Sequence, residues 1–173
     1  MQAIGSISQA QSLAGQELGV SDWMTIDQKR INEFADVTGD HQWIHVDVER
    51  ARAESPYGAP IAHGFLTLSL VPALGKDNFR LEGAKLAINY GLNKVRFLSA
   101  VPVDSRIRVR SQLADVDVVD DSTANLTVLH IIEIDGVKVK IRGLSWDEAT
   151  AISDQYPKNP KALAKAFICA CCT

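Results

Sequence analysis

The chain has little cysteine and no long apolar run. Its cysteines, Cys169, Cys171 and Cys172, all fall within the last five of the 173 residues. Such close neighbours cannot link distant parts of a fold, so we expect a reducing, cytoplasmic location. No stretch reaches the about 20 apolar residues that a membrane helix needs. Residues 1–15 lack a basic segment followed by an apolar core, so neither membrane insertion nor a signal peptide is expected.

The chain also has no excess of positive charge. Its 18 Lys and Arg residues against 21 Asp and Glu residues give a formal net charge of -3, without a basic block. Proteins that bind nucleic acids neutralise phosphates with such residues, so nucleic-acid binding is disfavoured. Hydrophobic residues make up 46% of the chain, which suits a globular protein with a sizeable core. We expect one domain over residues 1–173, with a polar lead-in at residues 1–15.

The first regular element is expected at Val20–Ile26, which has the pattern of a short strand. Thr25 and Gln28 then have the spacing of a capping box, and apolar residues recur on one helical face up to Gly39, which ends the helix. An aspartate at position 47 could cap a short helix over residues 47–52.

A second helix is predicted at His63–Leu74. Pro72 should end or kink its last turn. A helix that is apolar nearly all round is buried, so this one is expected in the core. Its apolar residues are Phe65, Leu66, Leu68, Leu70, Val71, Ala73 and Leu74.

Alternating apolar and polar residues then predict strands. They cover Lys85–Phe97 with a bulge at Gly91, Arg106–Arg110, and Leu126–Ile134, with a turn at residues 120–122 between the last two. One buried helix followed by long antiparallel strands predicts an α+β fold, a curved antiparallel sheet wrapped around a central helix.

The last part of the chain is less regular. Asp135-Gly136 predicts a hairpin turn leading into Val137–Ile141. Residues 146–160 suggest a loop or short helix. Ala162–Cys172 could form a last strand, although its alanines also permit a helix.

Asp40 and His45 are the first candidates for chemistry. A carboxylate and an imidazole held together can position and deprotonate a water molecule. Trp43 and Ile44 between them could shield the pair from bulk water, which strengthens their interaction. The alternative is structural, with Asp40 as a turn residue and His45 as a hydrogen-bonded polar group.

His63-Gly64-Phe65 is the second candidate. A glycine that opens a helix has a backbone N–H without an intrahelical partner, which can stabilise a developing oxyanion. Alternatively, Gly64 only lets the chain turn into a tightly packed helix. Ser69 lies five residues after Gly64, and its hydroxyl could equally bond back to a helix carbonyl.

These residues resemble the motif of the MaoC-like dehydratase family, within it the R-specific enoyl-CoA hydratases in the NodN-like branch. The resemblance rests on FADVTGDHQWIHVD, IAHGFLTLSLVPAL and KLAINYGLNKVRF. It implies a hot-dog fold, a homodimer, and syn hydration of trans-2-enoyl-CoA to (R)-3-hydroxyacyl-CoA without a cofactor or a metal. The acyl-CoA thioester is then the substrate.

Carried over by position, the resemblance makes Asp40 and His45 the catalytic pair. It makes Gly64 the donor to the thioester oxygen, and Ser69 a hydroxyl that helps to position the catalytic carboxylate. Gln42-Trp43 departs from the Asn-Pro of many relatives. Residues 137–173 form an atypical C-terminal segment. A hot-dog acyl-CoA thioesterase and a non-catalytic acyl-CoA or partner-binding module remain alternatives.

Overall fold

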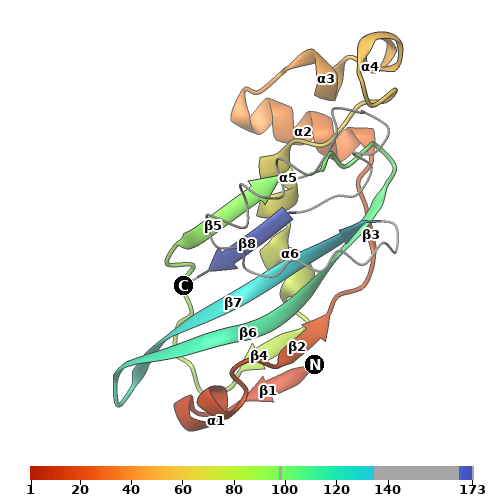
Figure 1. Ribbon diagram of the computed structural model, residues 1–173. Coiled ribbons are helices and arrows are strands. Elements are labelled where there is room, and N and C mark those ends of the chain that lie inside the picture. Colours follow the sequence, from red (N-terminus) through yellow and green to blue (C-terminus); the bar gives the residue numbers. More distant parts are fainter. Residues whose placement is uncertain (98, 135–167, 173) are drawn as a thin grey trace, which may run out of the picture.

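The computed structural model describes residues 1–97, 99–134 and 168–172 (Figure 1). Short helices alternate with strands in the first half, and long strands dominate the second half. The helices are α1 (Ile7–Ser12), α2 (Gln28–Thr38), α3 (Trp43–Val46), α4 (Val48–Glu54), α5 (Gly64–Ser69) and α6 (Val71–Gly75). The strands are β1 (Gln2–Ile4), β2 (Glu17–Val20), β3 (Met24–Thr25), β4 (Phe79–Leu81), β5 (Leu92–Phe97), β6 (Arg106–Asp120), β7 (Thr123–Ile134) and β8 (Ile168–Cys172).

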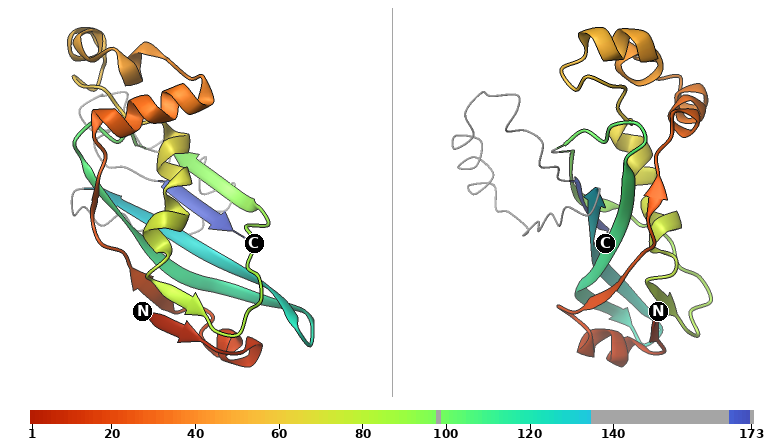
Figure 2. Two further views of the ribbon diagram at one scale, coloured as in Figure 1. Left: turned by 180° about the vertical axis from the view of Figure 1, so that it is seen from behind. Right: turned by 90° about the vertical axis from the view of Figure 1, so that its right-hand side faces the viewer.

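The main sheet has the strand order β2-β6-β7-β8-β5, and β3 also pairs with β6. Every neighbouring pair in it is antiparallel. Figure 2 shows α5 and α6 lying against one face of this sheet, with α2, α3 and α4 gathered at one end. The main core forms between them and includes Ile31, Leu66, Leu74, Val109 and Ile132. The predicted α+β architecture, a curved antiparallel sheet around central helices, is confirmed.

The central helix is divided in two. α5 ends at Ser69 and α6 begins at Val71, so the break lies at Leu70. Pro72 lies in the first turn of α6, where a missing N–H costs nothing, so the proline starts the second helix and does not end the first. The expectation of burial on all sides was wrong. Leu66 is buried, but Phe65 is 67% exposed.

Residues 1–15, which were expected to form a polar lead-in, contain one strand and one helix. β1 pairs in parallel with β4, and α1 is capped by Ser6, whose Oγ accepts the Gln9 N–H at 3.1 Å. Ile4 and Ala10 are buried in a second apolar cluster with Leu18 and residues of the β6–β7 hairpin. A few apolar side chains in a polar stretch therefore suffice to attach this segment.

α2 begins at a different cap from the one expected. Asp27, not Thr25, is the N-cap, and its Oδ1 accepts the Arg30 N–H at 2.9 Å. The expected end of α2 is confirmed, because Gly39 adopts the left-handed conformation with φ of 74°. Asp47 caps α4 as predicted. This geometry carries the chain from α2 directly into a turn at residue 40.

The strands in the structure agree in part with those predicted from the sequence. β6 and β7 and the turn between them are confirmed. Val20–Ile26 divides between β2 and β3, both paired with β6. β5 starts only at Leu92, so Gly91 precedes the strand instead of forming a bulge, and residues 86–90 form no strand. The irregular register lies between Leu92 and Lys94.

Only residues 168–172 of the predicted C-terminal region lie within the described part of the chain. Ile168–Cys172 forms β8 between β7 and β5, as the strand interpretation of this region required. The hairpin at residues 135–141, the segment 146–160 and residues 162–167 lie outside the described residues. Among the helices that the structure describes, none is long and apolar enough to cross a membrane.

Candidate active site

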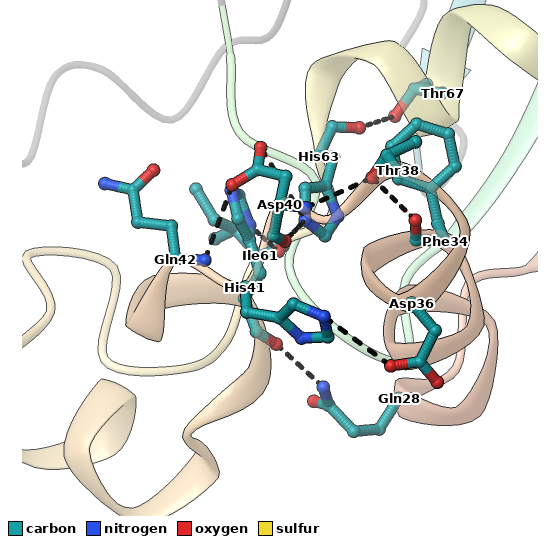
Figure 3. Close-up of polar contacts among 11 residues, drawn as sticks. Gln28, Phe34, Asp36, Thr38, Asp40, His41, Gln42, Ile61, His63 and Thr67 are labelled. Carbon is teal, nitrogen blue, oxygen red and sulfur yellow. Dashed lines mark hydrogen bonds and ion pairs between the residues drawn. The ribbon is translucent and has the colours of Figure 1, made fainter.

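Three elements bring Asp40, His45 and a second histidine, His63, together. Asp40 follows the glycine that ends α2, His45 lies in α3, and His63 immediately precedes α5. One side-chain N or O atom of each residue lies within 4.8 Å of those of the others. Figure 3 shows the Asp40 and His63 side chains beside one another at the end of α2. The predicted pairing of Asp40 with His45 in space is thus present in the structure.

The His45 ring is held in one tautomer by its hydrogen bond. Its Nδ1 lies 2.6 Å from the carbonyl oxygen of Ile61, which can only accept, so Nδ1 carries the hydrogen. Nε2 then keeps a free lone pair. Burial lowers the pKa of His45 from its ordinary value of 6.5. A buried, neutral imidazole with an available Nε2 has the properties of a general base near neutral pH.

Asp40 is the exposed member of the group, with 56% of its side chain accessible. Its Oδ1 accepts the Gln42 N–H at 3.4 Å, and its Oδ2 lies 4.0 Å from His63 Nε2. A carboxylate oxygen of Asp40 lies within 4.8 Å of a ring nitrogen of His45. A single water molecule can bridge this distance, because each hydrogen bond that the water makes spans about 2.8 Å.

His63 is a part of the site that the sequence interpretation left without a role. Its Nε2 lies 2.9 Å from the backbone oxygen of Asp40, so Nε2 carries the hydrogen and donates it. Its ring stacks on that of His45, with centroids 3.8 Å apart and an interplanar angle of 29°. Its Nδ1 is buried and has no hydrogen-bond partner among the residues that the structure describes. The motif His-Gly at the helix start was the available signal.

Gly64 and His45 line the same cavity, of about 170 Å³. Since α5 begins at Gly64, its N–H belongs to the first-turn amides that lack an intrahelical acceptor. A Cβ at this position would lie 2.8 Å from Cγ of Phe97, too close for any other residue without movement of the ring. The close approach of Phe97 gives Gly64 a packing role, and the oxyanion role stays a prediction. The cavity is completed by Tyr57, Ile61, Ala62, Thr67, Phe97, Ser99, Ala100 and Val101.

Ser69 lies elsewhere. It is exposed at the end of α5 and lines a second cavity of about 460 Å³, together with His130 and Lys76. In the described part of the chain, no hydrogen bond joins Ser69 to Asp40. Of the hydroxyl-bearing residues that line the first cavity, Thr67 lies one helical turn after His63 and donates to the His63 carbonyl oxygen at 3.3 Å. The structure therefore places Asp40 and Gly64 each near His45 and leaves Ser69 apart.

A chain of buried polar groups lies behind the second cavity. The Asn78 amide donates to Ser111 Oγ at 2.8 Å and to the Val109 carbonyl at 3.0 Å. Ser111 Oγ lies 3.0 Å from His130 Nδ1. Because the serine oxygen accepts from Asn78, its own hydrogen is free to point to Nδ1. Burial lowers the pKa of His130 to about 4, so this ring is neutral near pH 7.

Asp40, His45 and His63 could be considered as metal ligands because of their proximity. The two rings are stacked, so their in-plane lone pairs do not converge on one point. Ligands of a bound metal approach it from different directions. One nitrogen of each ring also donates to a backbone carbonyl. This geometry suits proton transfer better than metal binding, and the lack of a metal or cofactor stays a prediction.

A curved antiparallel sheet around a central helix pair, with an acid and an imidazole beside the helix start, defines a protein of the hot-dog class. The family described as "MaoC like domain" matches residues 9–133. The chain belongs to the MaoC-like dehydratase family, which confirms the resemblance seen in its sequence.

Two relatives and one solved structure illustrate the match. The chain is 51% identical over 136 residues to 3-hydroxyacyl-thioester dehydratase Z of Mycobacterium tuberculosis, covering 79% of this chain and 89% of that protein. It is 45% identical over 161 residues to Nodulation protein N of Rhizobium meliloti, covering 91% and 97%. The unliganded R-hydratase PhaJ1 of Pseudomonas aeruginosa has a TM-score of 0.62 at 17% identity, covering 92% and 78%. The last comparison supports the fold alone.

Proposed function

We propose that the protein is an (R)-specific enoyl-CoA hydratase, which adds water syn to trans-2-enoyl-CoA and gives (R)-3-hydroxyacyl-CoA. The observation that carries this proposal is the His45 ring. It is buried, donates through Nδ1 to Ile61, and has a ring nitrogen within 4.8 Å of an Asp40 carboxylate oxygen, a distance that one water can bridge. The mycobacterial relative, 51% identical, is named a 3-hydroxyacyl-thioester dehydratase. Dehydration of a 3-hydroxyacyl thioester is the reverse of the proposed hydration, so this name supports the proposal.

The reaction begins with a water molecule held between the Asp40 carboxylate and His45 Nε2. The thioester makes C3 of the enoyl chain electrophilic. The water oxygen attacks C3, its proton passes to Nε2, and the electrons of the double bond move onto the thioester oxygen as an enolate. The N–H of Gly64 donates to that oxygen. The imidazolium then returns its proton to C2 on the face that received the hydroxyl group, which makes the addition syn.

Asp40 has two functions in this scheme. Its carboxylate orients the water by accepting a hydrogen bond, and its charge stabilises the imidazolium formed during the reaction. The reaction needs no cofactor, because the thioester of the substrate supplies the activation.

Product analysis tests the proposal. Purified protein is incubated with crotonyl-CoA and with a longer trans-2-enoyl-CoA, and the 3-hydroxyacyl product is resolved by chiral chromatography. We expect the (R) enantiomer without release of free CoA. Release of CoA from a saturated acyl-CoA without hydration would establish the thioesterase alternative, and no turnover of either compound would favour a binding module.

Two substitutions assign the roles. Asp40→Asn and His45→Gln should each lower kcat by about 10²–10⁴-fold, the range for groups in general acid–base catalysis. The double variant should lose less than the product of both effects, because the residues act on one water. His41→Gln is the matched control, since His41 is an exposed neighbour that pairs with Asp36 at 3.7 Å. Full activity in Asp40→Asn would contradict the assignment.

A further inference from the structure

His63 contacts the two proposed catalytic residues and precedes a third functional position. It donates from Nε2 to the Asp40 backbone oxygen, at 2.9 Å, and stacks on the His45 ring. It is also the residue directly before Gly64. Asp40 and His63 are 23 positions apart in the chain, so the hydrogen bond ties the end of α2 to the start of α5.

Packing alone does not account for a histidine here. The side chain is 3% exposed, and its Nδ1 is buried without a partner among the described residues. A buried polar atom without a hydrogen bond costs free energy, whereas an aromatic hydrocarbon ring could stack on His45 without that cost. The group that distinguishes histidine from phenylalanine is therefore the Nε2–H, which holds the Asp40 backbone.

We propose that His63 is a positioning residue, which fixes the Asp40 turn and the His45 ring at the separation that one bridging water requires. This inference rests on the proposed hydratase function. The hydrogen bond fixes the backbone of Asp40, whose exposed side chain has few other contacts to restrain it. The stacked ring restricts rotation of the His45 imidazole.

The stacking also has an electrostatic consequence. The His63 ring, whose centroid lies 3.8 Å from that of His45, opposes protonation of His45. Burial is the largest cause of the lowered pKa of His45. The presence of His63 lowers this pKa further, whereas Asp40 raises it. The groups that face His63 are Asp40 from the turn after α2, His45 from α3, and the uncharged ring of Phe34 from α2, at 5.0 Å. His63 thus helps His45 to stay in its basic form.

Two variants separate the contributions of His63. His63→Phe keeps a ring against His45 but removes the donor to Asp40. His63→Gln keeps a donor in the position of Nε2 but removes the ring. We expect His63→Phe to lower kcat by about 10²-fold, the effect of a displacement of about 1 Å in a catalytic group, with KM nearly unchanged. His63→Gln should keep most of the kcat that His63→Phe loses. The control His41→Gln should have the kcat of the unchanged protein.

A second measurement needs no turnover. NMR titration of the His45 ring protons in the substrate-free protein should show a higher His45 pKa in His63→Phe than in the unchanged protein. If the unchanged protein does not hydrate enoyl-CoA, the proposed function fails, and this titration still reports whether His63 acts on His45. The positioning role is overturned if His63→Phe keeps its kcat per folded molecule, or if His63→Gln is no more active than His63→Phe. It is also overturned if the His45 titration is the same with and without His63.

Discussion

The buried ring of His130 predicts a loss of stability in mild acid. His130 is 9% exposed, and burial lowers its pKa from 6.5 to about 4. The folded state therefore favours the neutral ring more than the unfolded state does. Its contribution to stability is fully present above pH 6.5 and is lost as the pH falls towards 4 and below. A gap of about 2.5 between the two pKa values corresponds to about 3 kcal/mol of unfolding free energy.

The hydrogen bonds of His130 suggest a variant that isolates this contribution. His130→Asn does not titrate, and its amide oxygen can accept from the Ser111 hydroxyl as Nδ1 does. Urea unfolding is measured at pH 7 and at pH 4.5 for both proteins. The unchanged protein should lose about 2 kcal/mol more than the variant between these pH values, since most of the His130 transition lies in that interval.

The comparison between the two proteins removes other acid-sensitive groups. His45, whose pKa is also lowered, and the carboxylates are common to both, so their contributions cancel. His41→Asn, at an exposed histidine, should retain the full acid sensitivity and serves as the control. Equal losses of unfolding free energy in the unchanged protein and in His130→Asn would refute the argument that a buried, neutral His130 is responsible.

Three further predictions concern the site and the assembly. Gly64→Ala should displace the ring of Phe97 and lower the free energy of unfolding by about 1–3 kcal/mol. The double variant Gly64→Ala with Phe97→Leu should lose less than the sum of the two single losses. If urea unfolding shows that the two losses add strictly, the ring does not oppose a side chain at Gly64. The kcat/KM for hydration should fall as the pH drops through the His45 pKa, with a midpoint below 6.5, because only the neutral ring accepts a proton; a pH–rate profile with a higher midpoint contradicts this. β5 lies at an edge of the described sheet, so sedimentation at micromolar concentration should show a dimer that covers it, and monomer alone would be evidence against that pairing.

The sequence predicts the long strands and the acid–imidazole pair well, for physical reasons that are local. Over residues 106–113 of β6, buried side chains alternate with more exposed ones, and such a period of two has few interpretations other than a strand with one buried face. Asp40 follows a helix that a glycine ends, so its place in a turn was also a local matter. The fold class followed from the order of these elements.

Features that depend on contacts between distant segments could not be predicted from local sequence patterns. The role of His63 arises because the end of α2 returns to the start of α5, which spacing along the chain does not reveal. The separation of Ser69 from Asp40 has the same origin, since the second cavity forms only when α5 and α6 pack beside residues 89–92. Similarly, the burial of Ile4 depends on a parallel pairing between β1 and β4.

The apolar residues that were expected to be buried but are exposed have a common explanation. Phe65 was expected in the core and Leu86, Ile88 and Tyr90 on a strand, yet all four side chains are exposed. An apolar pattern in a sequence records burial of any kind, including burial against a second copy of the chain, whereas a single chain shows only its internal contacts. The Phe65 ring lies 5.5 Å from that of Phe97, on the edge strand β5. The exposed apolar surface thus continues onto the sheet edge that the predicted dimer would cover, so the excess of apolar residues and the free edge favour the same assembly.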